Sequence, residues 1–485
     1  MLLALASGRR TPFVAARRSW PFGQQDRVVW HRLVVGKAFQ GGLTQGKSSA
    51  MASILDKDEL LEWNALSAVE RVLPSAPKGG KPSEEVRHAI SGFRTLRKAF
   101  LARLSDEKRA ALTETKKPPQ AQKKSKKEAV ESEEERKQRF AALDQFAVRD
   151  PTTSSVCNLV DIGINIQSRF KKKEILAQLE RSAATGTNRA ILTGCSLKSS
   201  LEGIELCRSW YKAPSSEDQE AASKFPIGGL AKGTNVRLYA TVGVHPHDAK
   251  TIASEEGVDA TKMAEIRKLA ESPFCVSLGE CGLDYDRMFS PMKSQQHAFE
   301  AQVALAAELG RPLFVHLREV DTEKGPPLGA VEHAATILSK FPSLVPEKVC
   351  VHCFTGDKES LKLLCERGYR IGLTGFVGMN KRATSSGTLE ALGADSPLKL
   401  DALMIETDSP FMRPDKSWIP KETGLLKGRE NEPSVLPAVC RAVAQVFHGG
   451  KYTPEEIATV STQNAISFFD LEKADAAIAD SGQGF

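Results

Sequence analysis

Eight short hydrophobic runs, each of the length of a β-strand, alternate with helical stretches from about residue 157 onward. The intervening segments include SQQHAFEAQVALAAEL and SVLPAVCRAVAQVF, whose apolar residues suit one face of a helix. Eight strands separated by helices, over about 310 residues, predict an α/β fold of the (β/α)8 TIM-barrel type. We place this domain at residues 157–473 and a short tail at 474–485. The runs are NLVDIGIN, RAILTG, LYATVGV, CVSLGE, PLFVHL, VCVHCF, YRIGLTG and ALMIET.

Three segments of different composition precede the predicted barrel. Residues 1–50 are rich in Arg and nearly free of acid, which is typical of a transit peptide for a mitochondrion or plastid, or else of a basic tail. Residues 51–104 carry apolar residues at helical spacing and predict a small helical module. Residues 105–156 contain blocks of Lys and of Glu, the composition of a charged linker. We therefore expect the chain before about residue 150 to be dispensable for chemistry.

The net charge of +7 resides in the basic leader. Residues 1–50 hold six Arg and two Lys against Asp26, so residues 51–485 sum to zero. Any nucleic-acid binding must therefore come from a local patch of charge. Met51 could serve as an alternative start that removes the leader, and KKSKK in the linker has the composition of a nuclear-import patch. The nucleus and the cytoplasm are thus the alternative locations.

The cysteines and the hydrophobic runs bear on the redox compartment of the protein and on its association with membranes. The nine cysteines form no disulfide framework, which fits a reducing compartment. Cys350 and Cys353 have the spacing of a zinc or redox pair, but residues three apart in a strand point to opposite faces, so we interpret them as core. No apolar run approaches the roughly 20 residues that a membrane span needs, so we expect no membrane partner.

Polar residues gather where the predicted strands end, which is where barrel enzymes carry their chemistry. A single buried histidine is more often a satisfied core residue than a ligand. Here, however, five of eight predicted strands end in a carboxylate or an imidazole, and unpaired buried charges cost several kcal/mol. A metal site is therefore the favoured interpretation. The residues are His245, His247, Glu280, Asp284, Arg287, His316, His352, Glu406 and Asp408.

Eight motifs occur in the order, and with nearly the wording, of the TatD family of metal-dependent deoxyribonucleases, which residues 159–469 resemble. The resemblance implies a barrel hydrolase that holds one or two divalent ions and cleaves DNA, with 3′-to-5′ exonuclease action on single-stranded ends. The alternatives are a related hydrolase of esters or amides, such as misacylated tRNA, and a catalytically weak scaffold. The motifs are DIGIN, GVHPHD, GECGLDYDR, VHLRE, VHCFTG, GLTGF, IETDSP and RENEP.

The same resemblance assigns roles to individual residues. Glu280, His316, His352 and Asp408 would be the metal ligands. Asp408 would also orient or deprotonate the attacking water. His245 would contact the scissile phosphate or support the metal ligands. Asp408, Glu280 and His245 are thus the catalytic candidates.

Much of the family has two histidines at the end of the first strand, where this chain has Gly163 and Asn165. An Asn carbonyl is a weak ligand, so one ion would depend on the carboxylates of the site and on water. Oxygen ligands favour Mg²⁺, with Mn²⁺ as a second choice. The ion beside His316 and His352 would also accept Zn²⁺. We therefore predict Mg²⁺ as the main cofactor, with Mn²⁺ or Zn²⁺ as alternatives.

The predicted partner is DNA, as a single strand or a 3′ end. Arg287 and Arg429 could grip phosphate through their planar guanidinium groups, or form salt bridges within their loops. The loop at 411–433 interleaves aromatic residues with cations, as single-stranded nucleic-acid grooves do. Trp418 in this loop is our candidate for stacking on a base, and Asn165 is a further candidate for contact with the substrate. The sequence does not specify an oligomeric state.

Overall fold

The structure of the protein is a computed structural model, which describes residues 104–105, 131–211, 234, 236–320, 325–428 and 430–480. The chain divides into two compact units, Met1–Val130 and Glu131–Phe485. The basic leader, nearly all of the helical module and Arg429 lie outside the described residues, so the inferences about them stay predictions. Among the described helices, none combines the length and the hydrophobicity that a membrane span requires.

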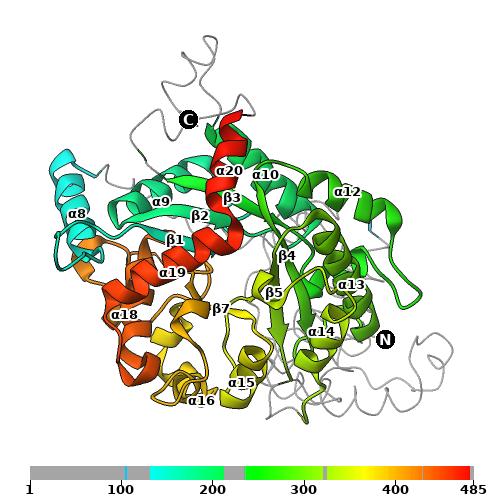
Figure 1. Ribbon diagram of the computed structural model, residues 1–485. Helices are drawn as coiled ribbons and strands as arrows, with labels where there is room; N and C mark the ends of the chain where they lie inside the picture. The colour runs from blue at the N-terminus through cyan, green and yellow to red at the C-terminus, as the bar shows by residue number, and fades with distance from the viewer. Residues whose placement is uncertain are drawn as a thin grey trace, which may run out of the picture. The chain divides into compact units, whose positions relative to one another are not determined.

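Parallel strands in simple chain order form the centre of the second unit (Figure 1). Each strand pairs with the next, and a parallel bridge between Ile164 and Ser409 joins the chain after the last strand to the first. The ring is thereby nearly closed, which confirms the predicted (β/α)8 barrel. The strands are β1 Leu159–Ile164, β2 Thr187–Leu192, β3 Arg237–Val242, β4 Cys275–Asp284, β5 Leu313–Arg318, β6 Val349–Val351, β7 Arg370–Leu373 and β8 Leu403–Ile405.

Helices follow the strands and cover the outside of the ring. α13 shows why the sequence is helical, because Ala298, Phe299, Val303 and Ala306 recur at helical spacing and are buried. It ends at Gly310, whose left-handed φ of 64° is a common helix stop. The main helices are α9 Lys172–Ala184, α10 Leu197–Tyr211, α12 Ala260–Ala270, α13 Met292–Leu309, α14 Ala330–Leu338, α15 Lys358–Glu366, α16 Asn380–Ser385, α17 Thr388–Ala391, α18 Leu436–Val446, α19 Pro454–Phe469 and α20 Leu471–Ile478.

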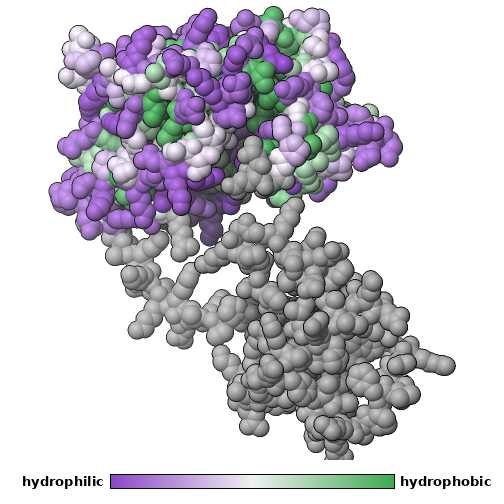
Figure 2. Space-filling model, turned by 90° about the horizontal axis from the view of Figure 1, so that it is seen from below, coloured by the Kyte–Doolittle hydropathy of each residue, from purple (hydrophilic) through white to green (hydrophobic). Residues whose placement is uncertain are grey.

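The strands bury their side chains between the helices and the barrel interior. Every residue of β1 and of β4 is buried, including Ile162 and Ile164. The surface seen in Figure 2 is instead mostly hydrophilic, with hydrophobic residues in small separate groups. This division is expected of helices that turn an apolar face to the sheet and a polar face to water.

Helix α8, Glu133–Phe146, belongs to the barrel unit, although its sequence was assigned to the charged linker. It begins at Ser132, which forms a reciprocal capping box with Glu135. Only Leu143 and Phe146 of the helix are buried, and they pack against the loop that follows β8. The Glu-rich composition of this segment indicated a solvated linker and gave no sign of these two contacts. The cluster comprises Leu143, Phe146, Ile419, Leu425, Val435 and Ala438.

The other end of the barrel unit also differs from the prediction. The expected tail at 474–485 begins inside α20, where Ile478 is buried. Asp475 accepts a hydrogen bond from the hydroxyl of Tyr239 at 2.6 Å, so α20 is fastened to β3. The ordered barrel therefore continues past the predicted boundary at 473.

Candidate metal centre

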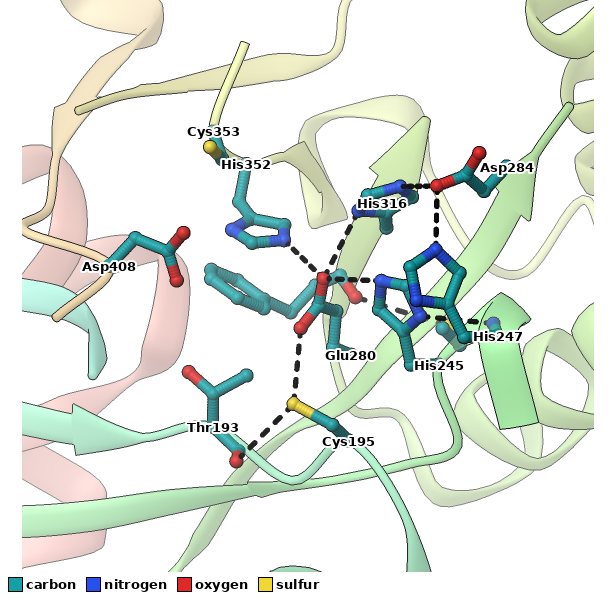
Figure 3. Close-up of polar contacts among 12 residues, drawn as sticks. Thr193, Cys195, His245, His247, Glu280, Asp284, His316, His352, Cys353 and Asp408 are labelled. Carbon is teal, nitrogen blue, oxygen red and sulfur yellow. Dashed lines mark hydrogen bonds and ion pairs between the residues drawn. The ribbon is translucent and has the colours of Figure 1, made fainter. Parts of the chain in front are cut away.

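Three imidazoles converge on one carboxylate oxygen at the carboxyl ends of the strands (Figure 3). The Oε1 atom of Glu280 lies 3.2 Å from Nε2 of His245, 3.2 Å from Nδ1 of His316 and 2.9 Å from Nε2 of His352. Glu280 comes from β4, His316 from β5, and the other two histidines follow β3 and β6. The structure thus brings together four of the predicted site residues.

Two glycines explain how Glu280 reaches this position. Gly279 and Gly282 have φ angles of 133° and 137°, which L side chains rarely adopt. A Cβ atom at Gly282 would lie 2.0 Å from the carbonyl oxygen of His316. The glycines of GECG therefore permit the close approach of β4 to β5 that sets Glu280 beside His316.

Glu280 contributes a negative charge to the site. Burial alone would raise the pKa of this carboxyl group, but its contacts with His245 and His352 outweigh burial and hold the pKa well below its usual value. Burial and the neighbouring His316 together lower the pKa of His245 to about 4, against the opposing effect of Glu280. At neutral pH the centre therefore holds an ionised carboxylate and a neutral His245.

The hydrogen bonds of the imidazoles indicate which ring nitrogens carry protons and which could hold a cation. Nδ1 of His245 accepts the backbone N–H of His247 at 3.0 Å, so the proton of this neutral ring must reside on Nε2, which faces Glu280. In His316 the outer nitrogen, Nε2, faces Asp284 at 3.3 Å, and in His352 the outer Nδ1 faces Glu406 at 3.3 Å. A proton on each outer nitrogen leaves the inner nitrogen with a lone pair for a cation.

This donor set fits a divalent cation. Two imidazole nitrogens and one carboxylate oxygen are a common set of protein ligands for such ions. Burial lowers the pKa of His352, but the carboxylates of Glu406 and Glu280 outweigh it and raise the pKa well above its usual value. These carboxylates therefore favour positive charge at this position, as a bound cation would supply.

Asp284 orients the His316 ring by contacting the ring nitrogen that faces away from Glu280. Its Oδ2 atom lies 2.8 Å from Nε2 of His247 and 3.3 Å from Nε2 of His316, and its Oδ1 atom accepts two backbone N–H groups. Burial would raise the pKa of Asp284, but the hydrogen bonds of His247 and His316 outweigh it and lower the pKa below its usual value. Arg287 lies beside this carboxylate, with Nη1 at 3.6 Å from Oδ2, and its side chain is 40% exposed.

Asp408 lies across the site from His245 (Figure 3). It occupies the turn after β8 with a φ of 48°, and Nδ2 of Asn165 donates to its Oδ1 atom at 2.9 Å. Burial raises the pKa of Asp408 well above its usual value, and the carboxylates of Glu406 and Glu280 add to this effect against the charge of His352. A positive charge in the centre would favour its ionised form.

The carboxylate of Glu406 occupies the space that the Cβ atom of a histidine at position 163 would need. A Cβ atom at Gly163 would lie 2.3 Å from Oε2 of Glu406, which is completely buried. Oε1 of Glu406 accepts the backbone N–H of Cys353 at 2.6 Å. The glycine of DIGIN thus makes room for the carboxylate that supports His352. From the sequence Glu406 is a carboxylate at a strand end, and its contact with His352 is visible only in the structure.

Cys195 also lies in the centre, and the sequence analysis missed it. Its Sγ atom lies 3.3 Å from Oε2 of Glu280 and 3.3 Å from Oδ1 of Asn165. Burial raises the pKa of this thiol well above its usual value, and Glu280 raises it further. The sequence feature that could have indicated Cys195 is its position directly after the second strand, at the same end of the barrel as the other site residues.

Trp418, the sequence-based candidate for stacking on a base, lies in the loop after β8. Its indole is half-buried, packs against the core, and donates from Nε1 to the carbonyl of Gly378 at 3.1 Å. The large aromatic side chains that are more exposed at this end of the barrel are Phe289 and Phe411.

Comparison with known proteins identifies the family of this barrel. The model of the family described as TatD related DNase matches residues 160–470. The chain belongs to the TatD-related DNase family. The 3′-5′ ssDNA/RNA exonuclease TatD of Rahnella sp. is 34% identical over 314 residues, which are 64% of this chain and 98% of that protein. The exonuclease of the same name from Erwinia amylovora is 32% identical over 314 residues, covering 64% of this chain and all of that protein.

Among solved structures, a hydrolase TatD family protein from Entamoeba histolytica aligns with a TM-score of 0.48 and 19% identity, covering 65% of this chain and 99% of that one. Membership of the TatD-related DNase family confirms the resemblance inferred from the eight motifs. It also confirms that the chain is a hydrolase of a metal-dependent family. Residues 1–159 lie outside the family match.

Proposed function

We propose that this protein is a metal-dependent 3′-to-5′ exonuclease that removes nucleotides from single-stranded DNA or RNA. The observation that carries the proposal is the convergence of Glu280, His316 and His352 at the mouth of the barrel, with Asp408 across the site. The relatives named as ssDNA/RNA exonucleases support this substrate class and extend our DNA expectation to RNA.

Glu280, His316 and His352 would hold the first ion. A bound ion in such a site polarises the phosphate and lowers the pKa of water. Nε2 of His245 carries a proton and faces Oε1 of Glu280, so this ring would support the metal-binding carboxylate or donate to a phosphate oxygen bound beside it. The roles inferred from the motifs for His245 and the three ligands thus agree with the tautomers that the geometry favours.

Asp408 would accept the proton of the attacking water. Its Oδ1 atom already accepts a hydrogen bond from Asn165, which leaves Oδ2 for the water. Asn165 therefore acts through Asp408 in this proposal and not as a metal ligand. Arg287, which is partly exposed beside Asp284, would contact a phosphate further along the strand.

The choice of metal follows from the donor atoms. Two imidazole nitrogens suit Mn²⁺ or Zn²⁺ better than Mg²⁺, which prefers oxygen ligands and retained waters. We therefore propose Mn²⁺ or Zn²⁺ beside His316 and His352. Mg²⁺ would suit the oxygen ligands of Glu280 and Asp408, so our expectation of Mg²⁺ as the main cofactor applies only to this second position.

The test is digestion of 5′-labelled single strands of DNA and RNA by protein that has been treated with chelator and dialysed. We expect no cleavage until Mg²⁺, Mn²⁺ or Zn²⁺ is added, and then a ladder that shortens from the 3′ end. His316→Ala should abolish the ladder, whereas His297→Ala, which alters a histidine on α13, should leave it unchanged. Cleavage in chelator, or cuts confined to internal positions, would contradict the proposal.

A further inference from the structure

Two phenylalanines stand exposed on opposite sides of the barrel mouth. Phe289 is 59% exposed and follows β4, whereas Phe411 is 44% exposed and follows β8. In a ring of eight strands in chain order, β4 and β8 lie across from each other. Single exposed hydrophobic residues are common on protein surfaces, so exposure alone decides nothing. The surroundings of the two rings are more informative.

The Phe289 ring is fixed beside the metal centre. Its centroid lies 4.7 Å from that of His247 with an angle of 76° between the rings, and the His247 ring lies 4.2 Å from that of His245. Lys250 donates from Nζ to the carbonyl oxygen of Phe289 at 2.8 Å. Ser290 donates to the carbonyl oxygen of His247 at 2.8 Å. The loop thus holds an aromatic face in solvent with a cation next to it.

The Phe411 ring is held in a similar way beside Asp408. The backbone N–H of Phe411 donates to the carbonyl oxygen of Asp408 at 2.9 Å. The guanidinium group of Arg169, from the loop after β1, lies 4.9 Å from the ring centroid. Arg169 is itself exposed. An aromatic face and a cation therefore stand together on this side of the mouth too.

We propose that Phe289 and Phe411 are stacking platforms for bases on the two sides of the scissile phosphate. This inference rests on the proposed function and names how the substrate is gripped. Aromatic rings beside cations are suited to single strands, because every unpaired base offers a flat face and every nucleotide carries a phosphate. Lys250, Arg287 and Arg169 supply the cations. Bases inside a duplex already have both faces covered by their neighbours, so the arrangement would favour single strands.

The experiment compares Phe289→Ala and Phe411→Ala on two oligonucleotides of the same length. One carries normal bases, and the other has abasic sites at the 3′ end. We expect each substitution to raise KM at least about fivefold on the normal strand, with a smaller change in kcat. On the abasic strand the variants and the wild type should have equal KM. Phe→Trp at either position should restore the wild-type KM, because it keeps a stacking surface.

Leu201→Ala is the matched control. Leu201 lies on α10 with the same 44% exposure as Phe411 and should be silent. Wild-type KM in both alanine variants, or an equal loss on normal and abasic strands, would overturn the inference.

If the wild type cuts neither strand, the proposed function fails. The binding of the labelled strands to the wild type and to the two alanine variants would then be measured by fluorescence anisotropy. A normal strand that binds the wild type at least about fivefold more tightly than the variants would still support the stacking platforms. Equal binding would overturn them.

Discussion

Asn165 at the end of β1 donates a hydrogen bond from Nδ2 to Oδ1 of Asp408 at 2.9 Å, and its own Oδ1 atom faces the thiol of Cys195. Because β1 and β8 are neighbours in the ring, this contact fixes the orientation of a carboxylate contributed by the far end of the chain. Much of the family has a histidine at this position. Here the strand contributes an amide that orients Asp408.

Asn165→Ala should therefore impair turnover without removing a ligand. Loss of a hydrogen-bonding partner behind a ligand or base commonly costs about 10- to 100-fold in activity or metal affinity, and we expect kcat to fall within this range. Asn158→Ala, which alters an exposed asparagine just before the same strand, is the control and should be silent. Single-strand cleavage at saturating metal measures both. Equal kcat in the two variants would show that Asp408 does not need the amide.

Glu406→Gln should weaken retention of the ion beside His352. The substituted amide can still accept the N–H of Cys353, but its neutral carbonyl holds the proton on Nδ1 of His352 less firmly. We expect metal affinity about 10- to 100-fold lower, measured by titration of metal-free protein and by the metal's stabilisation against heat. Glu332→Gln on the exposed face of α14 is the control. Unchanged affinity would make Glu406 a packing residue.

Helix α8 changes the expected limit of the active chain. A chain that begins near residue 150 lacks Leu143 and Phe146, and so uncovers Ile419 and Leu425 in the loop after β8. Each buried side chain of this size contributes roughly 1.5–3 kcal/mol, so the free energy of unfolding should fall by a few kcal/mol. A chain that begins at residue 131 should match the full-length protein. Urea unfolding of the three chains measures this, and equal stabilities would show that α8 contributes nothing.

Asp161 should make stability depend on pH. It is completely buried, accepts two hydrogen bonds from Thr407, and burial raises its pKa to about 8 from 3.8, with Glu406 adding to the rise. Between about pH 4 and 8 the unfolded chain therefore releases a proton that the folded chain keeps, and stability falls as pH rises.

Asp161→Asn removes this titration and still offers a carbonyl oxygen to Thr407. We expect its free energy of unfolding to improve relative to the wild type from pH 5 to pH 8, by urea unfolding. Asp395→Asn, at an exposed position, should show no such trend. A constant difference between Asp161→Asn and the wild type across this range would refute the assignment.

The sequence predicts the barrel and the gathering of the candidate ligands, because both depend on local patterns. Strand runs of the right length specify the order of the sheet. The candidate ligands lie in strands or directly after them, and parallel topology brings them together at one end of the barrel. The packing of Trp418 against Gly378 was not readable, because it depends on contacts between distant loops. Cys195 and the supporting role of Glu406 were missed for the same reason. A cysteine in a sequence is usually a buried core residue, so Cys195 did not stand out. The steric requirement for glycine at position 163 beside Glu406 becomes visible only when β1 and β8 lie side by side in the structure.

The closure of the ring also has a consequence for synthesis on the ribosome. β1 and α8 emerge early, yet the bridge of Ile164 needs Ser409 and the cluster around Phe146 needs Leu425. β1 can pair with β2 early, but its other edge and the apolar face of α8 gain their partners only after β8 has been made. A nascent barrel that ends before β8 would therefore expose both surfaces.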